Sequence, residues 1–514
     1  MADNPYSKRP QDENIVENKE LSLMEAMIPV VILIALLAYN ISMKGGEMFG
    51  GYSNHIILLI GAAIATAVGL FNKTSVVTIL QEIMENLRSV LVPILILFLV
   101  GALAGTWLIS GIIPAMVYYG LQVLSPSYFL PATVVIAAII SLATGSSWTT
   151  SATVGIALIG IGKALGIPAG MIAGAVISGA YFGDKMSPLS DTTNLAPAMA
   201  GGELFSHIKY MTITTVPTIL ITIVIFSILS LTITATGNAD VSNLLAVIDK
   251  TFYISPVLFT VPAVVIALII LLPNGPKDVS STVIDSEGKT AETTPFIKKV
   301  KPLIALGAGV ILAAIFAQVF QPSVLKGLPG TNIQDITTAI LSDTAITTEN
   351  EKLNELFSAG GVNGMLWTIY LILSAMVFGG VMDGIGALQR ITKSLLSMAT
   401  SVFGLFGTTV ASCLGLNIIA SDQYLAIVIP GKMFKNAFED RGLAPENLSR
   451  TLEDSGTVTS VLIPWNTCGA YQSGVLGVGV VEYAAYAFFN WMSPIATLVV
   501  AALGIKIKQA VKRN

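Results

Sequence analysis

The sequence predicts an all-α polytopic membrane protein built from two inverted repeats with broken helices. Composition is the first observation behind this fold class. Of the 514 residues, 54% are apolar and only 11% are charged, with a mean hydropathy of +0.77. A soluble domain usually carries about 25% charged residues. Apolar runs of about 17 to 25 residues recur along the chain, and each is long enough to cross a bilayer as a helix.

The two ends of the chain are predicted to be polar, cytoplasmic tails. Residues 1–22 lack a basic segment that runs directly into a short apolar core, so they are not typical of a signal peptide. Residues 506–514 form the second tail. Everything between, from 23 to 505, is predicted to be one transmembrane unit, because its only extended polar stretches are 273–301 and 321–363.

The apolar spans follow one another along this unit, and four of them are interrupted by polar residues. The spans lie near 23–43, 54–71, 89–110, 112–124, 128–162, 169–200, 208–235, 254–272, 302–320, 364–382, 395–430, 451–477 and 482–505. The polar breaks are ATGSSWTTSAT at 143–153, GDKMSPLSDTTN at 183–194, LNIIASDQYLA at 416–426 and TLEDSGTVTSVLIPWNTCG at 451–469.

The spacing of these breaks is the second observation behind the fold class. Ser147 lies 58 residues after the start of an apolar span, and Ser421 lies 57 residues after the start of another. Asp184 follows Ser147 by 37 residues, and Asp454 follows Ser421 by 33. The pattern predicts two repeats, about 54–235 and 302–505, linked by 236–301.

The distribution of charge predicts that the repeats are inverted. Five lysines crowd the central loop 273–301, whereas 321–363 is mainly acidic. The lysines are Lys277, Lys289, Lys298, Lys299 and Lys301. By the positive-inside rule, the central loop and the C-terminus are cytoplasmic and the insertion 321–363 is external. The two repeats then enter the membrane from opposite sides, which with matched broken segments is typical of secondary transporters.

Five carboxylates lie at or near the breaks, and a charge at membrane depth is costly unless it serves a function. They are Asp184, Asp191, Asp422, Glu453 and Asp454. The alternative is that some of them lie at a membrane–water interface. Lys185 could also be a structural counter-ion for Asp184, although adjacent side chains on a helix do not face each other.

The breaks are rich in hydroxyl and amide oxygens, which are ligands suited to a hard cation such as Na⁺. The predicted ion- or substrate-binding residues beside the carboxylates are Thr144, Ser146, Ser147, Ser187, Thr192, Thr193, Asn194, Asn417, Ser421, Thr457, Asn466 and Thr467. Trp148 is a further predicted residue of this site, and the alternative is that it only packs against neighbouring helices. Asp191 is the first candidate Na⁺ ligand, with Asp454 as its partner in the opposite repeat. A carboxylate that binds either H⁺ or Na⁺ gives the simplest basis for exchange.

Other classes of function lack support in the sequence. No Walker A motif signals ATP hydrolysis, and the two histidines and two cysteines form no catalytic or metal constellation typical of an enzyme. No basic cluster indicates a nucleic-acid partner. We therefore expect no cofactor, with Na⁺ and H⁺ as transported ions and the lipid bilayer as the surroundings.

Three stretches resemble the NhaC family of Na⁺/H⁺ antiporters. They are ATGSSWTTSATVGIALIGIG, ISGAYFGDKMSPLSDTTNLA and TLEDSGTVTSVLIPWNTCGAY, and the resemblance covers about residues 23–505. The family is part of a wider ion-transporter superfamily. The resemblance implies a homodimer in the bacterial inner membrane, with a scaffold domain and an elevator-like transport domain. It also implies re-entrant hairpins at 128–162 and 395–430 and broken helices at 169–200 and 451–477.

The resemblance leaves two substrates open. The expected function is Na⁺/H⁺ antiport. The alternative is Na⁺-coupled exchange of small carboxylates, because the family also includes a malate–lactate antiporter. No arginine lies within the four breaks, which favours a cation as the sole substrate. Backbone amides at helix N-termini can nevertheless bind a carboxylate.

Overall fold

Helices dominate the protein. The computed structural model describes residues 21–44, 48–232, 241–272, 282–284, 290–292 and 296–510. Within these residues, eight helices are long and apolar enough to cross a membrane, or ten if each of two bent pairs counts as one span. The prediction of an all-α polytopic membrane protein is confirmed.

The part of the chain before residue 273 runs from the N-terminal helix to a bent pair near residue 256. Its elements are α1 (Leu23–Lys44), β1 (Met48–Gly51), α2 (Ser53–Phe71), α3 (Val76–Ser89), α4 (Leu91–Ile109), α5 (Ile112–Val123), α6 (Pro126–Thr144), α7 (Ser147–Thr150), η1 (Ser151–Gly155), α8 (Ile156–Ala164), α9 (Ala169–Met186), α10 (Asp191–Ala200), α11 (Leu204–Thr232), α12 (Val241–Thr251), η2 (Pro256–Phe259) and α13 (Thr260–Leu271).

The second half contains two short antiparallel strand pairs, β2 with β3 and β4 with β5, among its helices. Its elements are β2 (Thr282–Ile284), β3 (Thr290–Glu292), α14 (Phe296–Phe320), α15 (Pro322–Lys326), α16 (Asn332–Leu341), β4 (Thr344–Ala345), α17 (Glu351–Leu356), β5 (Ser358–Ala359), α18 (Gly361–Gly384), α19 (Ala387–Ser397), α20 (Val402–Ile419), α21 (Leu425–Asp440), α22 (Pro445–Leu452), η4 (Glu453–Thr457), η5 (Ser460–Leu462), α23 (Thr467–Leu476), α24 (Val480–Tyr483), η6 (Ala484–Tyr486) and α25 (Phe488–Ala502).

The two halves repeat the same series of elements with a shift of 275 or 276 residues. The paired helices α10 and α23 each have ten residues and begin 276 positions apart. The left-handed turns that separate the helices follow the same shift. They are Gly111 and Gly386, Gly145 and Ser421, Gly166 and Gly442, and Gly201 and Gly477. A shared shift at four independent turns shows that the halves are structural repeats.

Packing extends this correspondence beyond the predicted repeat boundaries. Helix α1 packs on α2 as α13 packs on α14, and α3 packs on α18 as α16 packs on α4. Helix α13 therefore corresponds to α1 and belongs with the second repeat, although the spacing of the breaks places it in the linker 236–301. Helix α16, inside the predicted insertion 321–363, has a counterpart in α3. Helices α3 and α16 are amphipathic and short and carry little hydropathy signal, so the sequence does not show their relation.

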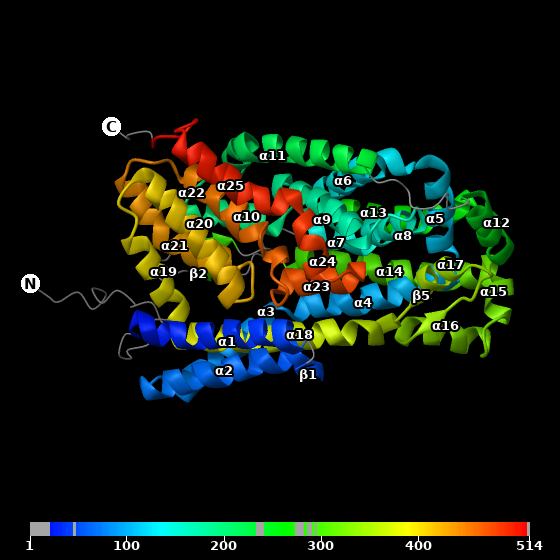
Figure 1. Ribbon diagram of the computed structural model, residues 1–514, viewed down its shortest axis with the longest axis horizontal. Helices are drawn as coiled ribbons and strands as arrows, with labels where there is room; N and C mark the ends of the chain where they lie inside the picture. The colour runs from blue at the N-terminus through cyan, green and yellow to red at the C-terminus, as the bar shows by residue number, and fades with distance from the viewer. Residues whose placement is uncertain are drawn as a thin grey trace, which may run out of the picture.

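The helices form two packed groups. In the first, α18 contacts α2, α3 and α4, while α14 contacts α4 and α13. In the second, α6 contacts α9 and α11, α11 contacts α25, and α10 contacts α21 and α22. Figure 1 shows α1, α2 and α18 along the lower edge of the molecule and α11 along the upper edge. The polar breaks lie mainly in the second group.

Close backbone contact holds the second group together. Helix α9 carries the glycine-rich run AGMIAGAVISGA against α6. A Cβ atom on Gly179 would lie 2.2 Å from the Val134 carbonyl oxygen, and one on Gly183 would lie 2.4 Å from that of Ala138. Only glycine fits at these two positions, and such small residues are the usual means of close helix packing in membranes.

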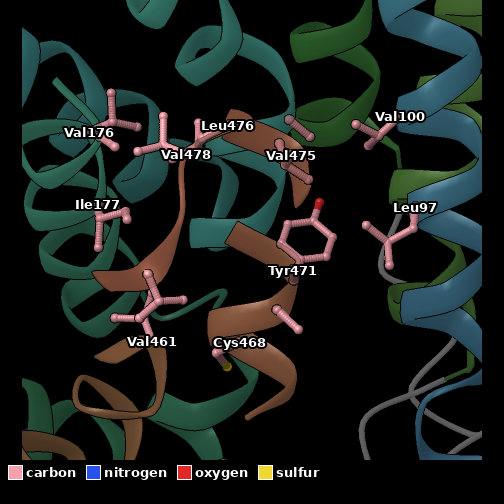
Figure 2. Close-up of a cluster of buried hydrophobic side chains, with 14 of the residues drawn as sticks. Leu97, Val100, Val176, Ile177, Val461, Cys468, Tyr471, Val475, Leu476 and Val478 are labelled. Atoms are coloured by element: carbon pink, nitrogen blue, oxygen red, sulfur yellow. The ribbon is translucent and has the colours of Figure 1, made fainter. Parts of the chain in front are cut away.

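A continuous apolar core joins the two groups. Figure 2 shows part of this core, in which Tyr471 and Val475 of α23 face Leu97 and Val100 of α4. A Cβ atom on Gly474 would lie 2.4 Å from the hydroxyl of Thr368 in α18. Helix α23 is thus the place where the second broken helix meets the first group.

Several of the residues that predict the orientation lie outside the described part of the chain. Residues 1–20, 273–281 and 511–514 lie outside it, and so do Lys277 and Lys289. Lys298, Lys299 and Lys301 lie in α14. The cytoplasmic assignment of the tails and of the loop therefore stays a prediction.

Candidate functional site

Each half contains one helical hairpin and one broken helix, and the tip of the hairpin lies at the break. Hairpin one comprises α6, α7, η1 and α8, and hairpin two comprises α20 and α21. A Cβ atom on Gly145, at the first tip, would lie 2.6 Å from Cβ of Leu189 and 3.0 Å from the Ser190 nitrogen. At the second tip, the carbonyl of Ser421 accepts a 2.9 Å hydrogen bond from the N–H of Thr467.

The boundaries of the first half agree with the sequence, but those of the second half need correction. Hairpin two runs from Val402 to Asp440 and the broken helix begins at Pro445, whereas the expected ranges are 395–430 and 451–477. The segment 431–450 is polar, so an apolar-run criterion ends the hairpin too early. It is nevertheless helical on both sides of a turn at Gly442.

Two of the predicted site residues, together with Ser190, cap the short helices that follow the tips and breaks. The hydroxyl of Ser146 accepts from the N–H of Thr149 at 3.2 Å, and the amide oxygen of Asn466 accepts from the N–H of Cys468 at 3.0 Å. Ser190 caps α10 in the same way. These contacts are ordinary N-caps that hold the broken ends in place.

Asp184 lies at the contact between hairpin one and broken helix one. Its carboxylate accepts hydrogen bonds from the N–H of Ser147 at 3.2 Å and from the hydroxyl of Ser147 at 2.7 Å. The side chain of Asp184 is 8% exposed. Among the described residues, no basic side chain lies within ion-pair distance of it. Asp184 is thus a buried carboxylate whose charge has no fixed counter-ion.

Asp454 has the opposite surroundings. One carboxylate oxygen pairs with the ammonium group of Lys185, and both side chains are fully buried. The other oxygen accepts hydrogen bonds from the hydroxyls of Thr214, at 2.8 Å, and Thr497. Arg450 adds a second positive charge 4.0 Å away. Asp454 thereby ties α9, α11, α22 and α25 together.

This arrangement corrects two expectations. Lys185 is not the counter-ion of its neighbour Asp184, because successive side chains leave a helix in different directions. Asp454 is not the repeat partner of Asp191. With the 276-residue shift, Asp191 corresponds to Thr467 and Asp454 corresponds to Ser178. The breaks recur in both halves, but the carboxylates lie at different positions within them.

Glu453 is a third kind of buried carboxylate. Its side chain is fully buried, and neither oxygen has a hydrogen-bond partner among the described residues. It begins the π-helical turn η4, and such turns are often found at functional sites. The hydroxyls of Ser455 and Thr457 in the same turn are also buried without a partner. This turn therefore gathers four buried oxygens that form no hydrogen bond of good geometry within the described residues, with Thr192 as a further hydroxyl close to Glu453.

Asp422 and Asp191 lie beside the tip and the break. Asp422 accepts hydrogen bonds from the N–H groups of Tyr424 at 2.8 Å and Leu425 at 3.1 Å. It therefore satisfies two N–H groups at the start of α21. Its other oxygen is 3.5 Å from the hydroxyl of Thr467. Asp191 is partly buried at the first position of α10. A carboxylate at a helix N-terminus is stabilised by the helix dipole, whatever its other role.

Several predicted ligands donate their protons to backbone carbonyls. The hydroxyl of Thr193 donates to the carbonyls of Asp184 at 3.2 Å and Lys185 at 2.9 Å, at the end of α9. Ser187 donates to Leu142 at 2.9 Å. The remaining contacts of this kind involve Thr144, Asn194, Asn417 and Asn466, and Thr192 lies 3.2 Å from the hydroxyl of Ser190. Such contacts hold together the segments on either side of each break. A hydroxyl oxygen that donates its proton in this way still has lone pairs with which it can bind a cation.

The structure adds residues that the sequence analysis does not single out. Thr214 and Thr497 lie inside apolar spans, and only the fold brings them to Asp454. Tyr471 stacks on Trp148 and donates its hydroxyl to the Trp148 carbonyl at 3.2 Å. These contacts join the two halves, as do the Lys185–Asp454 pair and the packing of α10 on α21. Ser147 and Ser421 therefore belong to one packed unit.

No group of three or more His, Cys, Asp or Glu side chains suited to holding a metal ion occurs in the described part of the chain. Asp191 and Asp454 are thus not gathered into a shared carboxylate cluster. The arrangement at Asp184 and Glu453 instead offers buried, uncompensated negative charge beside hydroxyl oxygens. Such a site can be neutralised by a proton or by a small hard cation.

Comparison with known proteins gives consistent matches. A family model described as the Na⁺/H⁺ antiporter family matches residues 179–505. The Na⁺/H⁺ antiporter NhaC of Alkalihalophilus pseudofirmus is 35% identical, with 88% of this chain and 91% of the relative covered. The malate-2H⁺/Na⁺-lactate antiporter of Bacillus subtilis is 31% identical, with coverages of 93% and 94%. The arginine/ornithine antiporter ArcD of Halobacterium salinarum is 31% identical, with coverages of 96% and 95%.

Proposed function

The chain belongs to the Na⁺/H⁺ antiporter family, and on this premise we propose that it exchanges Na⁺ for H⁺ across the cell membrane at a site centred on Asp184. The observation that carries this proposal is the burial of Asp184 with Ser147 as its hydrogen-bond donor and without a basic partner. An unpaired charge at membrane depth costs several kcal/mol. A bound Na⁺ or a bound proton removes most of that cost.

Exchange follows if the two ions exclude each other. Na⁺ needs the ionised carboxylate as a ligand, whereas a proton neutralises that carboxylate and removes its attraction for Na⁺. The site therefore crosses the membrane with either Na⁺ or a proton bound. It seldom crosses empty, because the empty site carries an uncompensated charge. Glu453, with its two unsatisfied oxygens, is the second residue we assign to the pathway. Asp191, Thr192 and Thr457 are the remaining oxygen donors of this proposed site.

The Lys185–Asp454 pair has a different role in this scheme. Both oxygens of Asp454 are occupied by fixed partners, so we assign the pair to holding the transport group together. Lys185 follows Asp184 in the sequence, and Asp454 follows Glu453. The ion pair therefore holds these two carboxylates, one from each half, at a fixed distance from each other. A displacement of the pair would change the spacing of the proposed site.

The charge balance of the buried region favours a cation over an organic anion. Asp184, Asp422, Glu453 and Asp454 are buried, and Lys185 and Arg450 are the buried basic side chains around them. When all four carboxylates are ionised, the two bases leave an excess of two negative charges. A bare malate or lactate ion would add to that excess. Na⁺-coupled carboxylate exchange, the activity in the name of one relative, is therefore the second candidate.

We further propose that the protein acts as a homodimer in which the group of α6, α9, α10, α11, α20, α21, α22 and α25 moves against the group of α2, α3, α4, α14 and α18. The two packed groups and the family resemblance support this division. The proposal assigns transport without a chemical reaction, and it requires no cofactor besides the transported ions.

Purified protein in liposomes tests the proposed function. A pH-sensitive dye inside the liposomes should report proton movement when Na⁺ is added outside, with no response to K⁺. Malate, lactate and arginine, each supplied as a salt of an inert counter-ion, should give no response alone and no increase with Na⁺. A Na⁺ response that requires lactate or malate would favour the second candidate. No response to any of these ions would overturn the proposed exchange.

A further inference from the structure

A buried aromatic contact connects the second half of the chain to the proposed cation site in the first half. The rings of Trp148 and Tyr471 are stacked, with centroids 4.0 Å apart and an angle of 21° between their planes. The Tyr471 side chain is fully buried, and its hydroxyl donates to the Trp148 carbonyl at 3.2 Å. Figure 2 shows Tyr471 projecting from α23 toward α4.

This contact acts on the helix turn that carries Ser147. Trp148 follows Ser147 in α7, a helix of only four residues between the tip of hairpin one and the π-helical turn η1. Backbone carbonyls at such a junction are less regularly paired than those inside an α-helix. The Tyr471 hydroxyl gives the Trp148 carbonyl a partner outside the hairpin. It therefore fixes the direction in which the preceding residue presents its N–H and hydroxyl.

Those two groups are the ones that hold Asp184. Ser147 gives the Asp184 carboxylate two hydrogen bonds, so a small rotation of α7 would move both of these donors together. A hydrogen bond weakens steeply when its angle becomes unfavourable. The position of the Asp184 carboxylate consequently depends on what holds Trp148.

The contact has no equivalent in the other half. With the 276-residue shift, Trp148 corresponds to Tyr424 and Tyr471 corresponds to Leu195. Leucine has no hydroxyl to donate, and Tyr424 is 38% exposed. The repeat architecture alone therefore does not require an aromatic residue at position 471. Its presence at this one position serves hairpin one.

From these contacts we infer that Tyr471 is a positioning residue for cation binding at Asp184, acting through Trp148 and Ser147. The inference rests on the proposed function. It assigns Tyr471 no direct contact with the ion. It also places the control of Na⁺ affinity partly in α23, the helix that faces α4 and α18 of the other packed group.

The test compares Tyr471→Phe with wild type in the liposome assay across a range of Na⁺ concentrations. Phenylalanine keeps the stacked ring and removes only the hydroxyl. Loss of one neutral hydrogen bond predicts that the apparent KM for Na⁺ rises by about three- to tenfold while the maximal rate is retained. Tyr471→Leu, which also removes the stacked ring, should raise the KM further. An unchanged KM in Tyr471→Phe would overturn the inference.

A matched control separates positioning from general packing. Tyr483 is also fully buried and also donates its hydroxyl to a backbone carbonyl, that of Val461, at 2.8 Å. Tyr483→Phe therefore loses the same kind of hydrogen bond without releasing α7, and its KM should equal that of wild type. If Tyr483→Phe raises the KM as much as Tyr471→Phe, the effect is structural and the inference fails.

A double variant tests the route through Ser147. If Tyr471 acts by orienting Ser147, then Tyr471→Phe should produce a clearly smaller further rise in KM once Ser147 is already alanine, because only the backbone N–H of residue 147 is then left to displace. Fully multiplicative effects of the two changes would mean that they act independently, which overturns the inference. Wild-type protein is measured first in every series. Absence of exchange in wild type refutes the proposed function, whereas normal wild-type exchange with an unchanged Tyr471→Phe refutes only the role of Tyr471.

Discussion

Asp184 and Asp454 show how two buried aspartates on matched broken helices acquire different roles. Asp184 receives its hydrogen bonds from Ser147 and has no fixed cation, whereas Asp454 has Lys185, Arg450 and two threonine hydroxyls. A carboxylate without a fixed counter-ion is free to bind a mobile one. A carboxylate with all its acceptor positions occupied is better suited to holding helices together.

Asp454→Asn should therefore destabilise the protein rather than only stop exchange. The change leaves Lys185 and Arg450 buried without a carboxylate, and breaking a buried ion pair by removing one partner costs about 3–5 kcal/mol. Size-exclusion chromatography after heating in detergent should show a clearly lower midpoint than wild type.

A double variant of the Lys185–Asp454 pair and a variant of an exposed aspartate are the two controls for this prediction. Lys185→Met combined with Asp454→Asn removes both charges, so the double variant should be more stable than Asp454→Asn alone. Asp440→Asn, on an exposed position of α21, should leave the midpoint within experimental error. A double variant that is as unstable as the sum of its single changes would show that the two residues do not act as a pair.

At the scale of elements, each break depends on close contact between a hairpin tip and a broken helix. Gly145 adopts a φ of 70° at the first tip, directly against Leu189 and Ser190. Gly477 adopts a similar φ of 62° after α23, but a Cβ atom there would have nothing within 4 Å. The two glycines share a left-handed backbone conformation and differ in whether other atoms lie close to the position of a Cβ atom.

This difference predicts unequal effects of alanine. Gly477→Ala should cost only the strain of a left-handed conformation, about 1–2 kcal/mol, and retain most exchange activity. Gly145→Ala should also push the tip away from Ser190, and so reduce the initial rate of Na⁺-driven proton movement by about tenfold or more. Equal rates for the two variants in the dye assay would mean that the tip contact is not needed.

The sequence predicts the breaks because they interrupt long apolar runs, and a polar segment at membrane depth is costly unless it lines a site or a cavity. It does not reveal which distant helices meet. The Lys185–Asp454 pair joins residues 269 positions apart, and no spacing rule identifies it. The repeat relation of α3 to α16 is hidden for a similar reason, because both helices are short and the second lies in a polar segment.

For the whole molecule, the central expectation is that the two halves cross the membrane in opposite senses. An orientation in which 321–363 is external places the start of α18 outside and α19, beyond its far end, inside. Ser323 in α15 and Ser397 in α19 are both exposed. Single cysteines at these two positions report the two sides directly, because the native Cys413 and Cys468 are fully buried.

An impermeant maleimide on intact cells should label Ser323→Cys and should label Ser397→Cys only after the cells are permeabilised. Wild-type protein, with its two buried cysteines, is the control for background labelling. The reverse pattern would place the insertion in the cytoplasm and invert the whole assignment.

The account as a whole depends on Asp184 as the carboxylate that carries Na⁺ and H⁺ in turn. Asp184→Asn keeps the shape of the side chain and an oxygen that can accept from Ser147, but it removes the charge and the titratable group. The direct measurement is Na⁺-driven proton movement in liposomes that contain equal amounts of folded wild-type or Asp184→Asn protein. The account predicts robust exchange by wild type and none above protein-free liposomes by Asp184→Asn. Exchange by Asp184→Asn at the wild-type rate would contradict it.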